Sequence, residues 1–125
     1  MKLVSWIGGN DLQAMIVEDI QGPIYATLKS TPVTELILLY NYQQSRVEPY
    51  LNWLESQFEI SITANYIPLT SPIDYREIYN AVDPLLSAAV SNKTKTTILL
   101  SPGTPAMQSV WILLGKTKYD VDFYQ

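Results

Sequence analysis

One stretch decides how the rest of the chain is interpreted: Thr97-Ile-Leu-Leu-Ser-Pro-Gly-Thr-Pro-Ala-Met107. It begins as an apolar run typical of a buried strand and then passes through a short turn. Gly103 can adopt a positive φ in that turn, and Thr104 followed by Pro105 is the pattern of a helix N-cap and first helical residue. The stretch therefore predicts a strand that opens directly into a helix. Such a turn is either an ordinary connection or a place where free backbone N–H groups receive an anion.

The same alternation of strand and helix patterns extends along the chain. Apolar or alternating runs predict five strands, at residues 3–7, 35–40, 58–64, 96–100 and 119–124. Helical spacing and capping signals predict helices at 12–19, 23–29, 45–57 and 105–114, and a further one that starts after an N-cap at Asp74. Pro84 is expected to kink or divide that further helix, and Gly115 to end the last one.

Strands that alternate with helices through short loops predict a Rossmann-like α/β fold. We expect a doubly wound, mostly parallel sheet of five or six strands with helices on both faces. Ligands of such sheets bind at the carboxyl ends of the strands, near the point where the strand order reverses. Loops with glycine follow the first and fourth strands, at 8–11 and 101–104. If those strands are neighbours, the two loops face each other.

The composition limits the class of protein. A chain of 125 residues with 47% hydrophobic residues predicts a single globular domain. It has neither Cys nor His, which excludes a disulfide framework, a thiolate zinc site and a Ser-His-Asp triad, so we expect no metal and no cofactor. The formal net charge of −4 argues against contact with duplex DNA. No apolar run approaches the roughly 20 residues that span a bilayer, and residues 3–7 are too short for a signal peptide, so a cytoplasmic protein without membrane contact is expected.

The loop Gly8-Gly9-Asn10-Asp11 is neither a dinucleotide-binding G-x-G-x-x-G motif nor a Walker A loop. Asn10 and Asp11 suit a turn or a helix cap, and they could equally contact a base edge or a ribose hydroxyl of a ligand. Tyr42 follows the second strand at the same edge and could stack on a base or be simply half-buried. Trp6 is predicted to be a core residue of the first strand.

The segment Leu99-Leu-Ser-Pro-Gly-Thr-Pro-Ala-Met-Gln108 resembles the strand-four motif of CARF domains, the CRISPR-associated Rossmann-like sensors. The loop at 8–11 stands where that family has its other ligand-contacting segment, and the order of elements is similar along nearly the whole chain. The resemblance, which extends to the amino-terminal domains of sigma-54-dependent RNA-repair regulators, implies a homodimer that binds a cyclic oligoadenylate or another small RNA-derived ligand across its two-fold axis. It also implies that residues 1–125 are one sensor domain, the amino-terminal part of a longer protein with an effector or transcriptional module.

The loops and the resemblance together indicate a set of candidate ligand-binding residues: Gly8, Gly9, Asn10, Asp11, Tyr42, Ser101, Pro102, Gly103, Thr104 and Met107. Many CARF domains have a Lys or Arg where this chain has Pro105, and this departure argues against strong phosphate binding and against ring cleavage. Two alternatives to a non-catalytic sensor remain. One is a metal-independent ring nuclease, for which the candidate catalytic residues are Ser5, Ser101, Thr104 and Lys116. The other is a dimerisation domain without a ligand.

Overall fold

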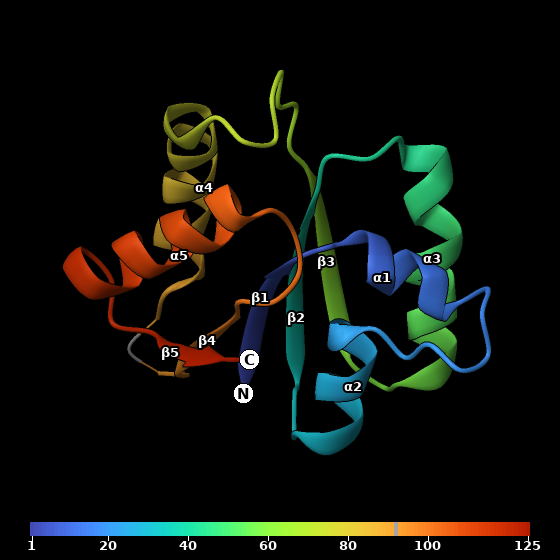
Figure 1. Ribbon diagram of the computed structural model, residues 1–125. Coiled ribbons are helices and arrows are strands. Elements are labelled where there is room, and N and C mark those ends of the chain that lie inside the picture. The colour runs from blue at the N-terminus through green and yellow to red at the C-terminus, as the bar shows by residue number, and fades with distance from the viewer. Residues whose placement is uncertain (92) are drawn as a thin grey trace.

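The computed structural model describes residues 1–91 and 93–125 as a five-stranded sheet between two layers of helices (Figure 1). The strands are β1 (Lys2–Trp6), β2 (Glu35–Tyr40), β3 (Ser61–Tyr66), β4 (Thr96–Leu99) and β5 (Asp122–Tyr124). Their order is β3-β2-β1-β4-β5, and every pairing is parallel. The predicted Rossmann-like fold is confirmed. Strand order reverses between β1 and β4, which are neighbours.

The helices divide into two layers on opposite faces of the sheet (Figure 1). On one face lie α1 (Gly9–Ala14), α2 (Pro23–Ser30) and α3 (Gln44–Gln57), and on the other α4 (Tyr75–Ala89) and α5 (Pro105–Thr117). Each face of the sheet has its own hydrophobic core, and successive side chains of a strand point to opposite faces. In β2, Leu36 and Leu38 pack in one core, and Ile37 and Leu39 pack in the other. No helix among the described residues is long and apolar enough to cross a membrane.

The bounds of three elements differ from the sequence prediction. Helix α1 begins at Gly9 and ends at Ala14, where 12–19 was predicted. Strand β3 begins at Ser61 because the N–H of Phe58 still donates to the carbonyl of Leu54 at the end of α3, at 3.0 Å. Strand β5 is confined to Asp122–Tyr124, and the preceding Tyr119 bonds through its hydroxyl to Asp83 of α4 at 2.6 Å.

Two residues that were expected to interrupt helices do not end them. Helix α4 runs from Tyr75 to Ala89 without division at Pro84, and side chains such as Ile78 and Leu86 bury its inner face. Helix α5 continues through Gly115 to Thr117. A Cβ at Gly115 would overlap the ring of Phe123, so the glycine provides room for β5 rather than a helix end. Tertiary packing outweighs local propensity at both positions.

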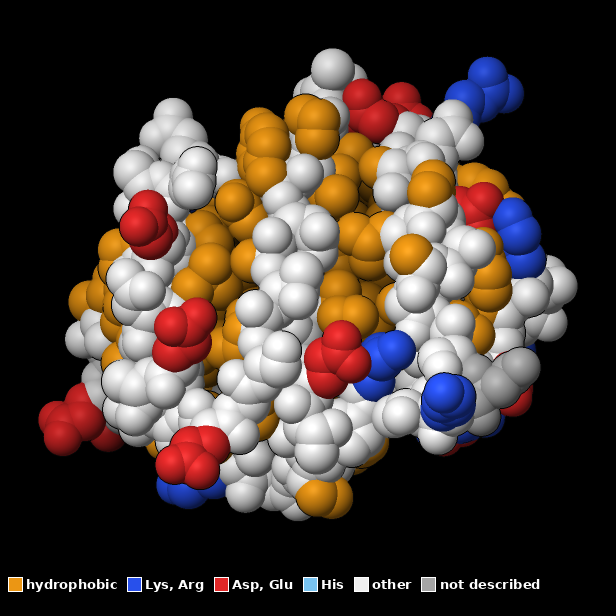
Figure 2. All heavy atoms as spheres, turned by 180° about the vertical axis from the view of Figure 1, so that it is seen from behind, with side chains coloured by type: hydrophobic (Ala, Val, Ile, Leu, Met, Phe, Trp, Pro, Cys, Tyr) orange, Lys and Arg blue, Asp and Glu red, His pale blue; other side chains and the backbone are white. Residues whose placement is uncertain are grey.

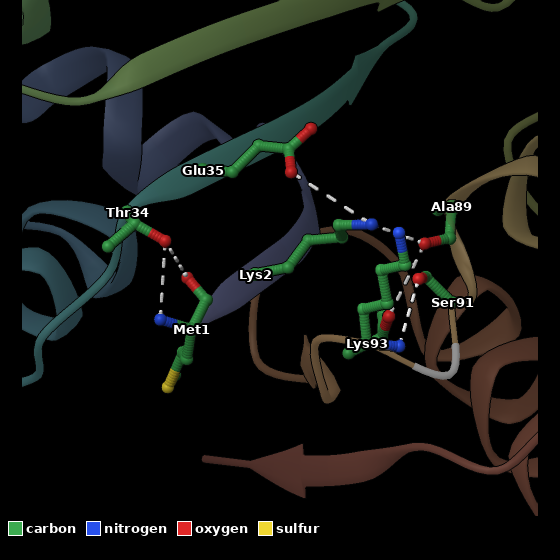
Figure 3. A network of polar contacts seen from close by, with 8 residues as sticks. Met1, Lys2, Thr34, Glu35, Ala89, Ser91 and Lys93 are labelled. Atoms are coloured by element: carbon green, nitrogen blue, oxygen red, sulfur yellow. Dashed lines mark hydrogen bonds and ion pairs between the residues drawn. The ribbon is translucent and has the colours of Figure 1, made fainter.

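Hydrogen bonds at the amino ends of the strands tie the chain terminus to its neighbours (Figure 3). The ammonium group of Lys2 donates to the carbonyl of Ala89, the last residue of α4, at 2.6 Å, and lies 3.9 Å from the carboxylate of Glu35. The N-terminal amine of Met1 contacts the hydroxyl of Thr34 at 3.4 Å. This edge of the sheet is therefore occupied by structural contacts.

Strand β3 forms one edge of the sheet, and its outer side is only partly covered. Viewed from behind, hydrophobic side chains lie in hollows on either side of it (Figure 2). The hollow toward α4 has a volume of about 210 Å³, and Ile37, Thr63 and Leu85 are among its lining residues. The loops that follow β1 and β4 lie elsewhere, beside the central strands of the sheet.

Candidate functional site

The two glycine-containing loops meet at the carboxyl edge of the sheet, as the sequence predicted. An ideal Cβ placed on Gly8 would lie only 3.1 Å from the backbone nitrogen of Gly103, so the loops are in direct contact. A cavity of about 200 Å³ lies between them, lined by Gly8, Gly9, Asn10, Asp11, Pro23, Ser101, Pro102 and Gly103. Most predicted ligand-binding residues are thus in one place, and Pro23 of α2 joins them.

The turn after β4 has the geometry expected from its sequence. Gly103 has a φ of +95°, and Pro105 is the first residue of α5. The Thr104 hydroxyl accepts a hydrogen bond from the N–H of Met107 at 3.2 Å, which is the predicted N-cap, and it donates to the carbonyl of Pro72 at 2.7 Å. Thr104 therefore joins the turn to the loop before α4.

Met107 lies beneath this turn, not on the surface of the cavity. Its side chain is only 5% exposed, and its sulfur would lie 2.7 Å from a Cβ at Gly103. The thioether also accepts a contact from the N–H of Thr104 at 3.4 Å. Met107 therefore supports the loop from below, because it fills the space that a side chain at Gly103 would need.

Asp11 borders the cavity, but its carboxylate is turned inward. It is 0% exposed, and its carboxylate accepts hydrogen bonds from the N–H of Gly8 at 2.8 Å and from that of Ile24 at 3.0 Å. Burial raises the pKa of Asp11 to about 6, and the two backbone hydrogen bonds partly oppose this rise. At Gly22, where φ is +73°, a Cβ would lie 2.9 Å from the Cα of Asp11. Asp11 thus fixes the first loop against the start of α2.

The mouth of the cavity offers backbone donors. The N–H groups of Gly9, Asn10 and Gly103 donate to no acceptor within residues 1–91 and 93–125. Gly9, Asn10 and Ser101 are exposed, and the nearest described atom from another part of the chain to an ideal Cβ at Gly9 is the Tyr42 hydroxyl oxygen, at 3.7 Å. Free N–H groups and hydroxyls in an open hollow suit the phosphates and sugar hydroxyls of a nucleotide.

Arg46 is a residue of this edge that the sequence analysis missed. Its guanidinium carbon lies 4.8 Å from the centre of the Tyr42 ring, which is a cation–π contact. Tyr42 is half-buried and precedes α3, and Arg46 lies in the first turn of that helix. The spacing of four residues across a helix start was the available signal, since it brings both side chains to the edge where ligands of such sheets bind.

Two of the candidate catalytic residues lie away from the cavity. Ser5 is fully buried within β1, where its hydroxyl donates to the carbonyl of Trp6 at 2.8 Å. Trp6 is itself buried, as predicted for a core residue. Lys116 lies in the last turn of α5, at the opposite end of that helix from the turn. Only Ser101 and Thr104 of the four candidates belong to the loops at the cavity.

No protein-family model matches the sequence, and no curated protein matches it significantly. Solved structures do match. One is a type III CRISPR defence DNA nuclease activated by cyclic oligoadenylate, with a TM-score of 0.63 and 19% identity over 99% of this chain and 18% of that chain. Another is Enterococcus italicus Csm6 bound to cyclic hexa-2'-fluoro-hexa-dAMP, with a TM-score of 0.77 and 16% identity over 94% of this chain and 30% of that chain. The chain shares their fold.

These matches agree with the motif-based resemblance to CARF domains, which is confirmed at the level of the fold. The chain spans less than a third of the length of either matched protein. At identities of 16% and 19% the likeness concerns the arrangement of the backbone, and function has to be argued from the site.

Proposed function

We propose that this chain is a sensor domain that binds a cyclic oligoadenylate, or a related RNA-derived nucleotide, at its carboxyl edge. The observation that carries the proposal is the meeting of the loops at 8–11 and 101–104 around a cavity with free N–H groups at its mouth. Phosphate oxygens accept from such N–H groups, Asn10 can contact a base or ribose, and Tyr42 can stack on a base. Both matched proteins are described with a cyclic oligoadenylate or an analogue, which supports this class of ligand.

The size of the cavity favours a ligand shared between two copies of the chain. A cavity for a drug-sized ligand has about 300–1,000 Å³, and this one has about 200 Å³, so one copy can hold only part of a nucleotide ring. A ring of identical nucleotides has rotational symmetry, and a two-fold dimer presents the same loops to it twice. The domain therefore functions as a homodimer in this proposal.

The face between α4 and α5 is the contact surface that we assign to this dimer. It contains an open groove of about 530 Å³ between the two helices, and Tyr75, Tyr79, Val110 and Leu113 are among its lining residues. Leu113 is 50% exposed. The hydrogen bond from Thr104 to Pro72 connects this face to the turn after β4, so a dimer formed here adjoins the ligand site.

We assign a regulatory role to the domain because, in this proposal, it binds the cyclic nucleotide without cleaving it. In this proposal residues 1–125 are the sensor part of a longer protein, and ligand binding changes the activity of an effector or a transcriptional module. Ring cleavage is not favoured, because Ser5 is buried, Lys116 is distant and the Thr104 hydroxyl is already engaged as donor and acceptor.

Isothermal titration of the purified chain with cyclic tri-, tetra- and hexa-adenylate tests the proposal, with linear tetra-adenylate as the control. We expect tight binding of one ring per two chains and an intact ring when each mixture is analysed by chromatography. Linear products would instead establish a ring nuclease. Absence of heat with every ring would exclude the cyclic adenylates as ligands.

A further inference from the structure

The cations of this chain are divided unevenly between the two edges of the sheet. All the lysines lie at the amino edge, where strands begin and helices end: Lys2, Lys29, Lys93, Lys95, Lys116 and Lys118. The two arginines, Arg46 and Arg76, lie in the first turns of α3 and α4, which start at the carboxyl edge. The edge with the cavity therefore holds arginine and no lysine.

Helix stability does not account for the position of Arg46. The first turn of a helix carries a partial positive charge, so a cation there is unfavourable. Helix α3 has no acidic residue in its first turn, and its N-cap residue, Gln43, makes no capping hydrogen bond through its side chain. Lys29 and Lys116, by contrast, lie in the last turns of α2 and α5, where a cation is favourable.

Arg46 is also not neutralised by an ion pair. Lys2, Lys95 and Lys118 each lie within 4.0 Å of a carboxylate, but neither arginine does among the described residues. Arg76 has Asp74 and Glu77 within the same turn of α4, so the local charge around it is negative. Around Arg46 no such acidic pair occurs in the first turn.

The contacts of Arg46 lead directly to the candidate site. Its guanidinium group lies over the Tyr42 ring at 4.8 Å, and the Tyr42 hydroxyl lies 3.7 Å from the position of a Cβ at Gly9. The N–H of Gly9 has no acceptor among the described residues. A cation, an aromatic ring and a free backbone donor thus follow one another along the same edge.

We infer that Arg46 is a phosphate-binding residue of this site, held in position by Tyr42. The inference rests on the proposed function and specifies which side chain recognises the anionic part of the nucleotide. A guanidinium group remains protonated and presents a planar set of donors that matches a phosphate. In a chain with a formal net charge of −4, such a local cation offsets the general repulsion of an anion.

The test compares Arg46→Gln with Lys29→Gln, which removes the same charge from a cation that also lies over a tyrosine ring, Tyr25, but at the opposite edge of the sheet. For whichever cyclic adenylate binds the wild type, we expect Kd to rise about tenfold in Arg46→Gln and to stay near the wild-type value in Lys29→Gln. The slope of log Kd against log salt concentration should fall by about 0.7 in Arg46→Gln, and Arg46→Lys should restore most of that slope. A merely structural residue would not change the salt dependence.

A second titration, with inorganic pyrophosphate, separates this inference from the proposed function. The amide resonances of Gly9 and Gly103 are followed by NMR, and we expect saturable shifts that Arg46→Gln weakens. If rings do not bind but pyrophosphate gives this pattern, the adenylate proposal fails and the inference stands. Equal binding by the wild type and Arg46→Gln, equal losses in the two glutamine variants, or no response at Gly9 to pyrophosphate would each overturn the inference.

Discussion

Among single residues, Asp11 has the environment least favourable to its charge. Its carboxylate is fully buried and bonded to the N–H groups of Gly8 and Ile24. The hydroxyl of Tyr50 is buried nearby without a hydrogen-bond partner among the described residues, and burial together with the charge of Asp11 raises the pKa of Tyr50. Asp11 fixes the loop at 8–11 against α2, at a cost in stability when its carboxylate is ionised.

The stability of the domain should depend on pH through Asp11. Its pKa is about 6 in the folded protein and close to the ordinary 3.8 in the unfolded chain, so the folded protein binds the proton more tightly. The contribution of Asp11 to the free energy of unfolding is therefore largest below pH 4 and is lost as the pH rises through 6. The total change is roughly 3 kcal/mol.

Urea unfolding of the wild type and Asp11→Asn from pH 4 to pH 7 measures this effect. Taking the difference between the two free energies of unfolding cancels the contributions of other groups. As the pH rises, the wild type should lose stability relative to Asp11→Asn. A difference that is constant over this range would show that Asp11 does not titrate there.

Thr104 distinguishes a sensor from a domain without a ligand. Thr104→Ala removes the N-cap of α5 and the bond to Pro72, and we expect the free energy of unfolding to fall by about 1–2 kcal/mol. If the proposed function is correct, affinity for the cyclic adenylate also falls strongly because the turn loses its anchor. Thr104→Ser keeps the hydroxyl and is the control, with both properties near the wild type. Loss of stability alone would favour the ligand-free alternative.

Among the elements, α5 and β5 depend on each other through Gly115. An exposed glycine in a helix usually gains about 1 kcal/mol of stability when it is replaced by alanine. Here the added methyl group would overlap the Phe123 ring and lie 2.9 Å from Val121, so we expect Gly115→Ala to lower the free energy of unfolding by about 1–3 kcal/mol. Urea unfolding measures this, and Ser109→Ala, at an exposed position of the same helix, serves as the control. A stabilised Gly115→Ala would contradict the packing argument.

For the molecule as a whole, the molecular mass in solution tests whether the chain forms the proposed homodimer. Leu113 is 50% exposed beside the groove between α4 and α5, so Leu113→Glu would place two carboxylates near one another at a two-fold contact. Sedimentation equilibrium should give the mass of two chains for the wild type and of one chain for Leu113→Glu. Ile16→Glu is the control, since Ile16 is 77% exposed but follows α1 on the other layer, and it should remain dimeric. A monomeric wild type, or a dimeric Leu113→Glu, would refute a dimer through this face.

Much of the fold could be predicted from the sequence because the deciding signals are local. The apolar run of β2 was predicted with its observed bounds, and the caps at Thr104 and Asp74 form the predicted hydrogen bonds with N–H groups three residues ahead. The positive φ at Gly103 also follows from its own turn. Each of these features depends on residues within one or two turns of the chain.

From the order of strands and loops alone, only the position of the candidate site at one edge of the sheet could be predicted. The loops at 8–11 and 101–104 could be placed at one edge, and their contact followed once β1 and β4 proved to be neighbours. The inward turn of Asp11 could not be foreseen, because it depends on the N–H of Ile24, thirteen residues away. Arg46 was missed because its spacing of four residues from Tyr42 is a weak signal, and only the structure shows the two side chains in contact.

The sequence by itself determined the succession of strands and helices, the parallel sheet, and the turn that opens into α5. Periodicity, caps and glycine conformations are set by neighbouring residues, so they can be recognised without coordinates. Only the tertiary structure decided that Gly115 makes room for Phe123, that Thr104 bonds to Pro72, and that the cations at the edge with the cavity are arginines and not lysines. These features join residues far apart in the chain, and their energies come from packing and hydrogen bonds that exist only when the whole domain has folded.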